Sequence, residues 1–412
     1  MATASHDPYA ALRFRDFRLF LAGRMLSTIG QQMLDVAIGW ELYERTHSAL
    51  ALGFVGLVLV VPIIAFALPS GHLADRQDRR GIVLITQLVL SVGSLTLAAI
   101  SFTRGPVALV FATLFVIGCA LAFNRPATAA LLPQLVPAAD FANAVTWSSS
   151  GFQIASVVGP ALGGAIIGIR KHAGPVYVVD AMLALAFLAC VWGIAGRQIE
   201  RRRETMTLSS LLAGIRFVRQ TKVILASITL DLFAVLFGGA TTLLPVFAKD
   251  ILHVGPVGFG WLRAAPSMGA LAMAIVLTHR PPMRRAGRSL LWAVAGFGVA
   301  TIGFGLSRSF ILSMVLLLLL GGLDNISVVV RHTLVQVRTP DAMRGRVSAV
   351  NGVFIDTSNE LGGFESGVTA ALLGPVVSVV AGGVITILVV VAVARLWPEL
   401  RDMGPLYEPG AA

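Results

Sequence analysis

The chain has 412 residues, of which 56% are hydrophobic and only 13% are charged. Soluble domains carry roughly 25% charged residues, so this composition excludes an ordinary soluble protein and favours one that resides in a lipid bilayer. The net charge of +11 does not indicate nucleic-acid binding, because the basic residues cluster in short connections between apolar runs, as membrane orientation requires.

Twelve apolar runs, each long enough to cross roughly 30 Å of hydrocarbon, are separated by charged or Pro- and Gly-rich breaks. The predicted spans are 17–43, 49–70, 82–102, 107–133, 141–168, 175–195, 223–248, 257–278, 289–307, 310–336, 342–372 and 374–396. The first run is longer than the roughly 7–15 apolar residues of a signal peptide, so it is predicted to be retained. We therefore predict an all-α integral membrane protein with twelve transmembrane helices in two six-helix pseudo-repeats.

The arginines predict the orientation of these spans. One set of alternate loops collects most of them: Arg13, Arg15, Arg18, Arg76, Arg79, Arg80, Arg197, Arg201, Arg202, Arg203, Arg280, Arg284, Arg285, Arg288, Arg338, Arg344, Arg346, Arg395 and Arg401. The opposite loops hold only Arg45, Arg104, Arg170, Lys171, Lys249 and Arg308. Because cytoplasmic loops carry the excess of basic residues, both termini are expected inside the cell.

The longest polar connection divides the chain into a predicted N-terminal bundle (1–196), a linker (197–222) and a C-terminal bundle (223–412). Within the linker, apolar residues recur at helical spacing from Ser209 to Gln220. This pattern predicts a cytoplasmic interfacial helix whose Arg216 and Arg219 meet anionic headgroups, although a simple solvated linker is the alternative.

The loop at 71–80 reads G-H-L-A-D-R-Q-D-R-R and closely resembles a signature of the major facilitator superfamily. In that family the loop helps to hold the outward-facing state, which implies a gating role for Gly71, Asp75, Arg76, Arg79 and Arg80. Gly71 permits close helix approach, and Asp75 can accept charge-assisted hydrogen bonds from guanidinium groups. The alternative is that the arginines only set the topology. The corresponding loop 279–288 lacks both the glycine and the acid, so orientation is the simpler interpretation there.

The fifth predicted span contains G-P-A-L-G-G, preceded by Gly151, and resembles the antiporter motif of major facilitator drug exporters. Gly159, Gly163 and Gly164 remove side chains where a neighbouring helix can pack, and Pro160 bends the helix. The resemblance implies export, whereas general small-residue packing would produce a similar string.

Three segments of the second half are similar to the branch that contains bacterial enterobactin exporters and macrolide efflux pumps. They are L-L-A-G-I-R-F-V at 211–218, L-L-P-V-F-A at 243–248 and T-P-D-A-M-R-G-R-V-S at 339–348. The resemblance covers nearly the whole chain and implies a bacterial inner-membrane protein that acts as a monomer. It does not identify the compound that is transported.

Ionisable groups inside the predicted spans are candidates for function, because each costs roughly 2.5–3.5 kcal/mol near the bilayer centre. The proton-coupling candidates are Asp35, Arg125, Asp324, Asp356 and Glu360, and the substrate-cavity candidates are Gln31, Gln32, Asp231, Arg331 and Glu365. Arg24 also lies within the first span. Arg125 resembles the fourth-span arginine of antiporters but lacks the glycine pattern that usually follows it.

Spacing relates some of these groups to one another. Asp324 and Arg331 share a helix face about 10 Å apart, at about 1.5 Å rise per residue. Asp356 and Glu360 lie one turn apart, and such like charges favour protonation of at least one of them. The alternatives are that Glu360 and Glu365 neutralise arginines such as Arg331, and that Asp35 makes a helix-to-helix hydrogen bond.

These features predict a proton-driven exporter of an amphipathic organic compound, such as a siderophore or drug, that works by alternating access. The expected partners are membrane lipid and a small-molecule substrate, with no nucleic acid. No cofactor or metal is expected, since the sequence has no phosphate-binding G-x-x-x-x-G-K-[ST] motif and its cysteines, Cys119 and Cys190, lie in apolar runs. A uniporter or importer of a small metabolite is the alternative, and no catalytic motif supports an enzyme or a receptor.

Overall fold

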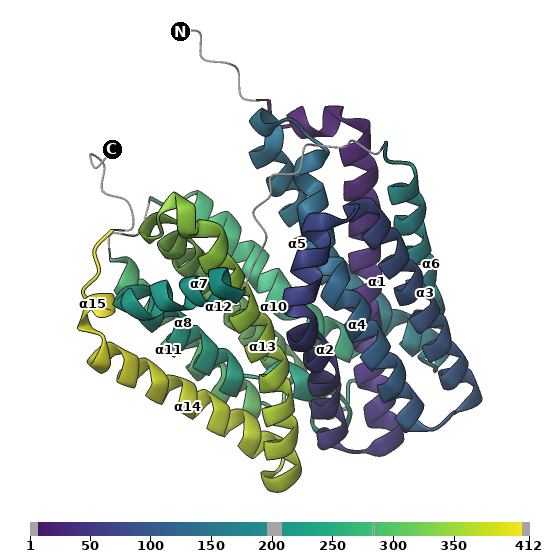
Figure 1. The fold of residues 1–412 in the computed structure, drawn as a ribbon. Coiled ribbons are helices and arrows are strands. Elements are labelled where there is room, and N and C mark those ends of the chain that lie inside the picture. Colours follow the sequence, from purple (N-terminus) through teal and green to yellow (C-terminus); the bar gives the residue numbers. More distant parts are fainter. Residues whose placement is uncertain (1–6, 196–207, 282, 284, 406–412) are drawn as a thin grey trace. The chain divides into compact units, whose positions relative to one another are not determined.

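The computed structural model describes residues 7–195, 208–281, 283 and 285–405. These residues form helices and short connections without a strand, which confirms the predicted all-α class. The long helices of the first half are α1 (Arg15–Thr46), α2 (Ala49–Arg76), α3 (Arg79–Thr103), α4 (Val107–Leu131), α5 (Phe141–Arg170) and α6 (Gly174–Trp192) (Figure 1). Those of the second half are α7 (Leu208–Gln220), α8 (Lys222–Phe237), α10 (Gly255–Thr278), α11 (Ala286–Leu306), α12 (Phe310–Arg338), α13 (Asp341–Leu373) and α14 (Pro375–Leu396), followed by the short α15 (Pro398–Arg401).

Ten stretches within the described residues are long and apolar enough to cross a membrane. They correspond to ten of the predicted spans, so the chain is a multi-pass membrane protein. The other two predicted spans coincide with α1 and α13, which are 32 and 33 residues long but more polar. The total of twelve spans therefore stays a prediction for these two helices.

Short turns connect several helices on the side that is expected to face outward. His47, Arg104 and Lys171 follow α1, α3 and α5, and each adopts a left-handed backbone with φ of 48°, 51° and 55°. Their N–H groups donate to carbonyls of the preceding helical turn, which satisfies groups that the helix end leaves open. The helices therefore stop within one or two residues and reverse direction in short loops.

The chain separates into two compact units. Unit 1 contains residues 1–38 and 61–206, and unit 2 contains residues 39–60 and 207–412. A buried cluster in unit 1 includes Phe17, Phe20 and Phe187, where the rings of Phe20 and Phe187 meet edge to face. Unit 2 has two such clusters, one around Leu230 and Leu334 and one around Val335 and Val347.

The helix expected from Ser209 to Gln220 corresponds to α7, which packs against α8 and α13 in unit 2 (Figure 1), and its place at the membrane surface stays a prediction. Part of its apolar face is used within the protein, because Val218 is buried in the cluster that contains Val347 and Val350. Leu212, Arg216 and Arg219 stay exposed, so this side of α7 remains available to headgroups. Residue 196 and the first part of the linker, 197–207, lie outside the described part of the chain.

The seventh predicted span, 223–248, lies within one of the ten apolar stretches, but the helix is interrupted inside it, because α8 ends at Phe237. The chain continues through η4 (Ala240–Leu243), α9 (Leu244–Val246) and a π-helical turn, η5 (Phe247–Ile251). The break falls at Gly238 and Gly239, and glycine lowers helix stability by about 1 kcal/mol relative to alanine. A Cβ at position 239 would lie 2.5 Å from Ser366 Oγ, so the break also lets α13 approach closely.

Candidate transport site

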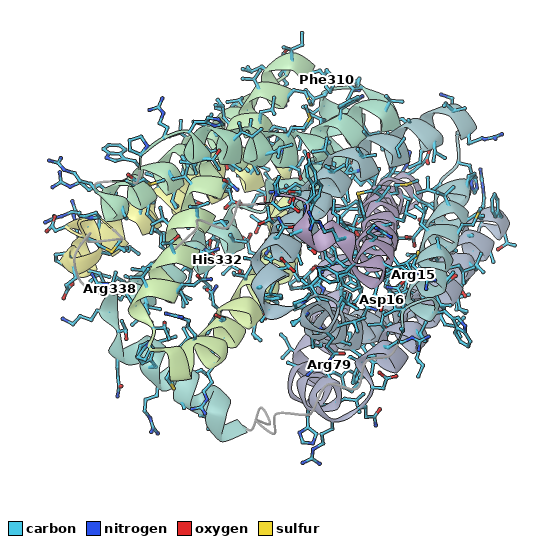
Figure 2. All side chains as sticks on the ribbon, turned by 90° about the horizontal axis from the view of Figure 1, so that it is seen from above. Arg15, Asp16, Arg79, Phe310, His332 and Arg338 are labelled. Atoms are coloured by element: carbon cyan, nitrogen blue, oxygen red, sulfur yellow. The ribbon has the colours of Figure 1, made fainter. Side chains whose placement is uncertain are left out.

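The arginines of the 71–80 loop bind the ends of neighbouring helices in unit 1. Arg79, at the start of α3 (Figure 2), donates to the carbonyls of Ala74, at 3.0 Å, and Ala130, at 2.8 Å. Ala130 belongs to the last turn of α4, where the carbonyl oxygens lack partners within the helix. Arg79 therefore fixes the end of α4 to the loop in addition to any effect on topology.

Arg80 does the same for α6. Its Nε donates to the carbonyl of Val191 at 3.0 Å, and its Nη2 donates to that of Trp192 at 2.5 Å. A cation at a helix C-terminus also interacts favourably with the helix dipole. The two arginines together tie the loop to the ends of α4 and α6.

Gly71 and Asp75 lie in the last turns of α2, and Arg76 is exposed at its end. The side chain of Asp75 lies outside the described residues, so the hydrogen bonds expected between its carboxylate and guanidinium groups stay a prediction. The structure adds Asp78, which sequence reasoning did not single out. Its carboxylate accepts hydrogen bonds from the N–H groups of Arg80, at 3.1 Å, and Gly81, at 3.2 Å, and thereby caps α3. An acid directly before a helical run is the signal that predicts such a cap.

The antiporter-like motif lies where α5 packs against α1. A Cβ on Gly159 would lie 2.8 Å from the carbonyl oxygen of Ile29, and one on Gly163 would lie 3.1 Å from the Cα of Met33. Position 159 therefore requires glycine for the observed helix approach, and a Cβ at position 163 would make an unusually tight contact. Pro160 and Gly164 are buried beside them, whereas Gly151 meets its nearest neighbour at an ordinary 3.5 Å.

The polar residues of α1 differ in their surroundings. Gln32 donates from Nε2 to Ser156 Oγ on α5 at 3.0 Å, next to the glycine contact. Gln31 is partly buried and Asp35 is exposed. Arg24 is partly buried, and its guanidinium lies 5.8 Å from the ring centre of Phe20. Arg125 on α4 is exposed, so unit 1 presents Asp35 and Arg125 as accessible charges.

Unit 1 also contains a buried carboxyl group that sequence reasoning missed. Asp180 lies in α6, within the predicted span 175–195, and is only 4% exposed. Its Oδ2 lies 2.5 Å from Ser94 Oγ on α3. The rule used for the other intramembrane charges would have found it, because it is an acid in an otherwise apolar run.

Unit 2 joins two of the predicted substrate-cavity residues in an ion pair. Arg331 of α12 contacts Asp231 of α8, and their side chains are 3% and 9% exposed. The Nε of Arg331 has no hydrogen-bond partner within the described residues. Burial of two charges is tolerated when they pair, so Asp231 is the counter-ion that allows Arg331 to lie inside the protein.

The remaining candidates of unit 2 lie on α12 and α13. Asp324 is partly buried two turns before Arg331, and next to it the amide oxygen of Asn325 is buried with no hydrogen-bond partner among the residues that the structure describes. Glu365 accepts a hydrogen bond from Thr369 Oγ1 at 2.8 Å. Glu360 is partly buried on α13, where its carbonyl lies close to Gly56. The side chain of Asp356 lies outside the described residues.

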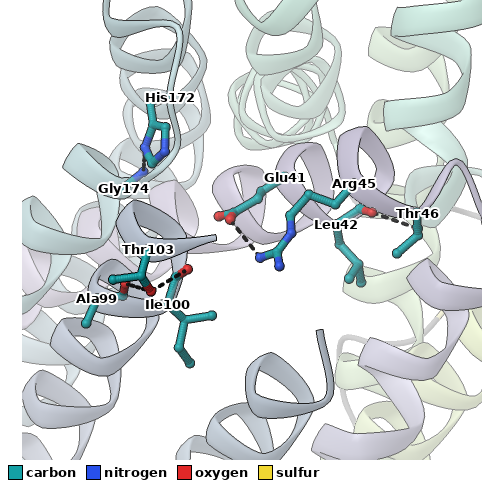
Figure 3. Close-up of polar contacts among 9 residues, drawn as sticks. All are labelled: Glu41, Leu42, Arg45, Thr46, Ala99, Ile100, Thr103, His172 and Gly174. Carbon is teal, nitrogen blue, oxygen red and sulfur yellow. Dashed lines mark hydrogen bonds and ion pairs between the residues drawn. The ribbon is translucent and has the colours of Figure 1, made fainter. Parts of the chain in front are cut away.

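The C-terminal end of α1 belongs to unit 2 and is held by polar contacts. Glu41 and Arg45, one helical turn apart, form an ion pair at 3.2 Å (Figure 3). The hydroxyl of Tyr43 donates to Asp250 in the π-helical turn η5. Trp40 stacks on Phe259 of α10 with 6.0 Å between ring centres. These contacts are local to unit 2 and explain why residues 39–60 group with it.

A surface groove of about 640 Å³ lies between α11 and α14. Its walls are mostly apolar, and basic side chains and Trp292 stand among them: Arg288, Leu291, Trp292, Ala295, Ile387, Val390, Val391, Ala394, Arg395 and Arg401. None of the candidate carboxylates lines this groove. It therefore does not mark the predicted transport pathway.

Residues 6–404 of the chain match the family described as transmembrane secretion effectors. The chain belongs to this family. Because the match spans nearly the whole sequence, it includes both predicted halves and the linker. The family consists of major facilitator transporters, which confirms the resemblance seen in the 71–80 loop.

Relatives of known activity agree with this assignment. The enterobactin exporter EntS of Shigella boydii serotype 18 is 25% identical over 386 residues, which cover 93% of this chain and 92% of that protein. EntS of Escherichia coli O1:K1 / APEC has the same identity and coverage. The similarity is therefore to whole exporters rather than to a single shared segment.

Solved structures with a similar fold are also membrane transporters. A bacterial homologue of the human lysosomal transporter Spinster gives a TM-score of 0.74 at 14% identity, covering 98% of this chain and 100% of that chain. A POT family transporter solved with 5-aminolevulinic acid gives 0.73 at 12% identity, covering 94% and 97%. At these identities the likeness establishes the fold of this secretion effector but not its substrate.

Proposed function

We propose that this chain is a proton-coupled exporter of an amphipathic organic compound in a bacterial inner membrane, with both termini in the cytoplasm. The observation that carries the proposal is the similarity to enterobactin exporters along 93% of the chain. The motif in α5 supports the outward direction by its resemblance to the antiporter motif of drug exporters, and its Gly159 lies at a close contact with α1. A siderophore or a hydrophobic drug is the proposed cargo.

Protons are the proposed source of energy. Acidic groups lie inside or beside membrane-spanning helices in both units, among them Asp35 and Asp324. A carboxyl group in such a place can take up a proton on one side of the membrane and release it on the other. In a transporter that alternates its access, uptake and release at a shared site couple proton entry to substrate exit.

The proposed role of the 71–80 loop is to stabilise one of the two access states. Arg79 and Arg80 connect this loop to the ends of α4 and α6. A movement of the loop would therefore be transmitted to these two helices. Asp75→Asn should leave insertion intact and slow turnover, because it removes only the charged acceptor. Transport at the wild-type rate in this variant would remove the gating role.

Everted membrane vesicles provide the test of export, because their outer surface is the cytoplasmic face. Labelled enterobactin, a macrolide and a cationic dye would be offered outside while the vesicle lumen is acidified. We expect accumulation of at least one of them, and its loss when an uncoupler removes the pH gradient. Accumulation that does not change on acidification would instead support the uniporter alternative.

Orientation is tested separately with single cysteines at Arg76 and Lys249. An impermeant thiol reagent should label the first only from the cytoplasmic side and the second only from outside. The opposite pattern would overturn the proposed placement of the termini.

A further inference from the structure

Asp180 is enclosed between three helices of unit 1. Its Oδ2 contacts Ser94 Oγ of α3 at 2.5 Å, and its Oδ1 faces Gly30 of α1. A Cβ on residue 30 would overlap with Oδ1 and would lie 3.3 Å from the Cα of Asp180. Glycine at this position therefore leaves the space that the carboxyl group occupies. The site is formed by α1, α3 and α6 together.

The hydrogen-bond geometry favours a protonated carboxyl group. Ser94 Oγ lies 2.5 Å from Asp180 Oδ2 and also 3.0 Å from the carbonyl oxygen of Leu90. A serine hydroxyl has one hydrogen, so it can donate to only one of these two acceptors. If Asp180 carries a proton, it donates to Ser94 and Ser94 donates to Leu90. Both contacts are then satisfied, whereas an ionised Asp180 leaves one of them without a hydrogen.

No basic residue of the described part forms an ion pair with Asp180. On α1, Asp35 lies five residues after Gly30 and is exposed, and Arg24 lies six residues before Gly30, with its guanidinium against Phe20. The charged residues of α3 are Arg79 and Arg80 at its far end, where they bind carbonyl groups. A buried charge is costly without an oppositely charged partner, whereas a protonated carboxyl group needs only its hydrogen bonds.

We propose that Asp180 is a proton-binding site, closed by Ser94 and Gly30. When it takes up a proton from water, an O–H bond of a hydronium ion breaks and an O–H bond of Asp180 forms, and no other bond changes. The site deepens the proposed proton coupling and rests on that proposal only for its role in transport. Proton binding itself can be measured without any substrate.

Infrared spectroscopy of the purified full chain in lipid vesicles detects protonated carboxyl groups directly. Spectra would be recorded from about pH 4, near the ordinary pKa of aspartate, to about pH 9. We expect wild-type protein to show the C=O band of a protonated carboxyl group that disappears toward high pH. Asp180→Asn should lose this band, while Ser94→Ala should keep it at a shifted frequency because the carboxyl group loses its acceptor.

Asp140→Asn is the matched control, since Asp140 lies in the same unit at the start of α5 and makes no capping hydrogen bond. Its spectrum should match that of wild type in the C=O region. A band that persists unchanged in Asp180→Asn, or no band that depends on residue 180 at any pH, would overturn the proposal. If Asp180→Asn fails to fold, the frequency shift in Ser94→Ala still decides, and an unshifted band counts against the site. A band that behaves as expected in a protein without proton-driven export would refute the proposed function and leave the proton site in place.

Discussion

Removal of Asp231 should destabilise unit 2 strongly, because it leaves the Arg331 guanidinium without a counter-ion. The Arg331 side chain is 3% exposed, so water cannot replace the lost carboxylate. Loss of one partner from a buried ion pair costs about 3–5 kcal/mol, and the low exposure of both side chains places this pair in that class. We therefore expect Asp231→Asn to lower the free energy of unfolding by about 3–5 kcal/mol.

The double replacement Asp231→Leu with Arg331→Met separates the ion pair from general packing. Two apolar side chains of similar size carry no buried charge, so this variant should unfold within about 1–2 kcal/mol of wild type. Arg331→Met alone should be destabilised, but less so at acid pH, where a proton can neutralise Asp231. The deficit of Asp231→Asn should not diminish on acidification, since the arginine keeps its charge.

Equilibrium unfolding in mixed micelles of dodecyl maltoside and sodium dodecyl sulfate, followed by tryptophan fluorescence, provides the free energies. Asp231→Leu alone completes the cycle; if the double variant loses the sum of the losses of Asp231→Leu and Arg331→Met, the side chains do not interact and the ion-pair interpretation is wrong. If the double variant is stable but binds no substrate, the pair also serves the substrate cavity. Substrate binding at the wild-type level would show that Asp231 and Arg331 are not needed in the substrate cavity.

Three further predictions concern packing, an exposed ion pair and a helix cap. Gly269→Ala should destabilise the α10–α12 contact by about 1–3 kcal/mol, because its Cβ would overlap with a backbone carbonyl of α12. Gly352→Ala is the control and should not destabilise the protein, since its Cβ would meet open space. Thermal unfolding in detergent compares the two variants. A hydrogen bond from Lys222, at 2.8 Å, lowers the pKa of Glu399, so Lys222→Gln should raise this pKa toward its ordinary value in a carbon-13 NMR titration. The pair stabilises the fold above the unfolded pKa of Glu399 and ceases to do so as the pH falls through the folded value. Since both side chains are exposed, this stabilisation is small, and the thermal midpoint should change little. Asp78→Ala should cost about 1 kcal/mol and speed amide hydrogen exchange in the first turn of α3.

Much of the fold follows from the sequence because the bilayer imposes simple rules. Long apolar runs must be helical, and the charged breaks between them locate the turns. The same rules do not show where a helix is interrupted inside the protein. The break after Phe237 depends on α13 approaching Gly239, which is a tertiary contact. The adjacent glycines at 238 and 239 were the local signal, because their low helix propensity reduces the free energy that is lost when the helix is interrupted there.

The candidate site was predictable as a set of residue types but not as a set of partners. The rule that charges in the membrane have a function or a partner singled out Asp231 and Arg331, yet their pairing joins α8 to α12 across 100 residues. Proximity of that kind is not encoded in helical spacing. Asp180 was open to the same rule and was overlooked, and only the contacts with Ser94 and Gly30 show how it is enclosed.

Proton movement during export tests the central claim most directly. The purified chain would be reconstituted into lipid vesicles with its cytoplasmic face outward. The vesicle lumen would be acidic and would hold a pH-sensitive dye, and enterobactin would be added outside. Exchange predicts that the lumen becomes more alkaline as enterobactin enters, at a rate that rises with its concentration, and that vesicles without the protein show no change. Entry of enterobactin with no change in lumenal pH would contradict proton-coupled export by this chain.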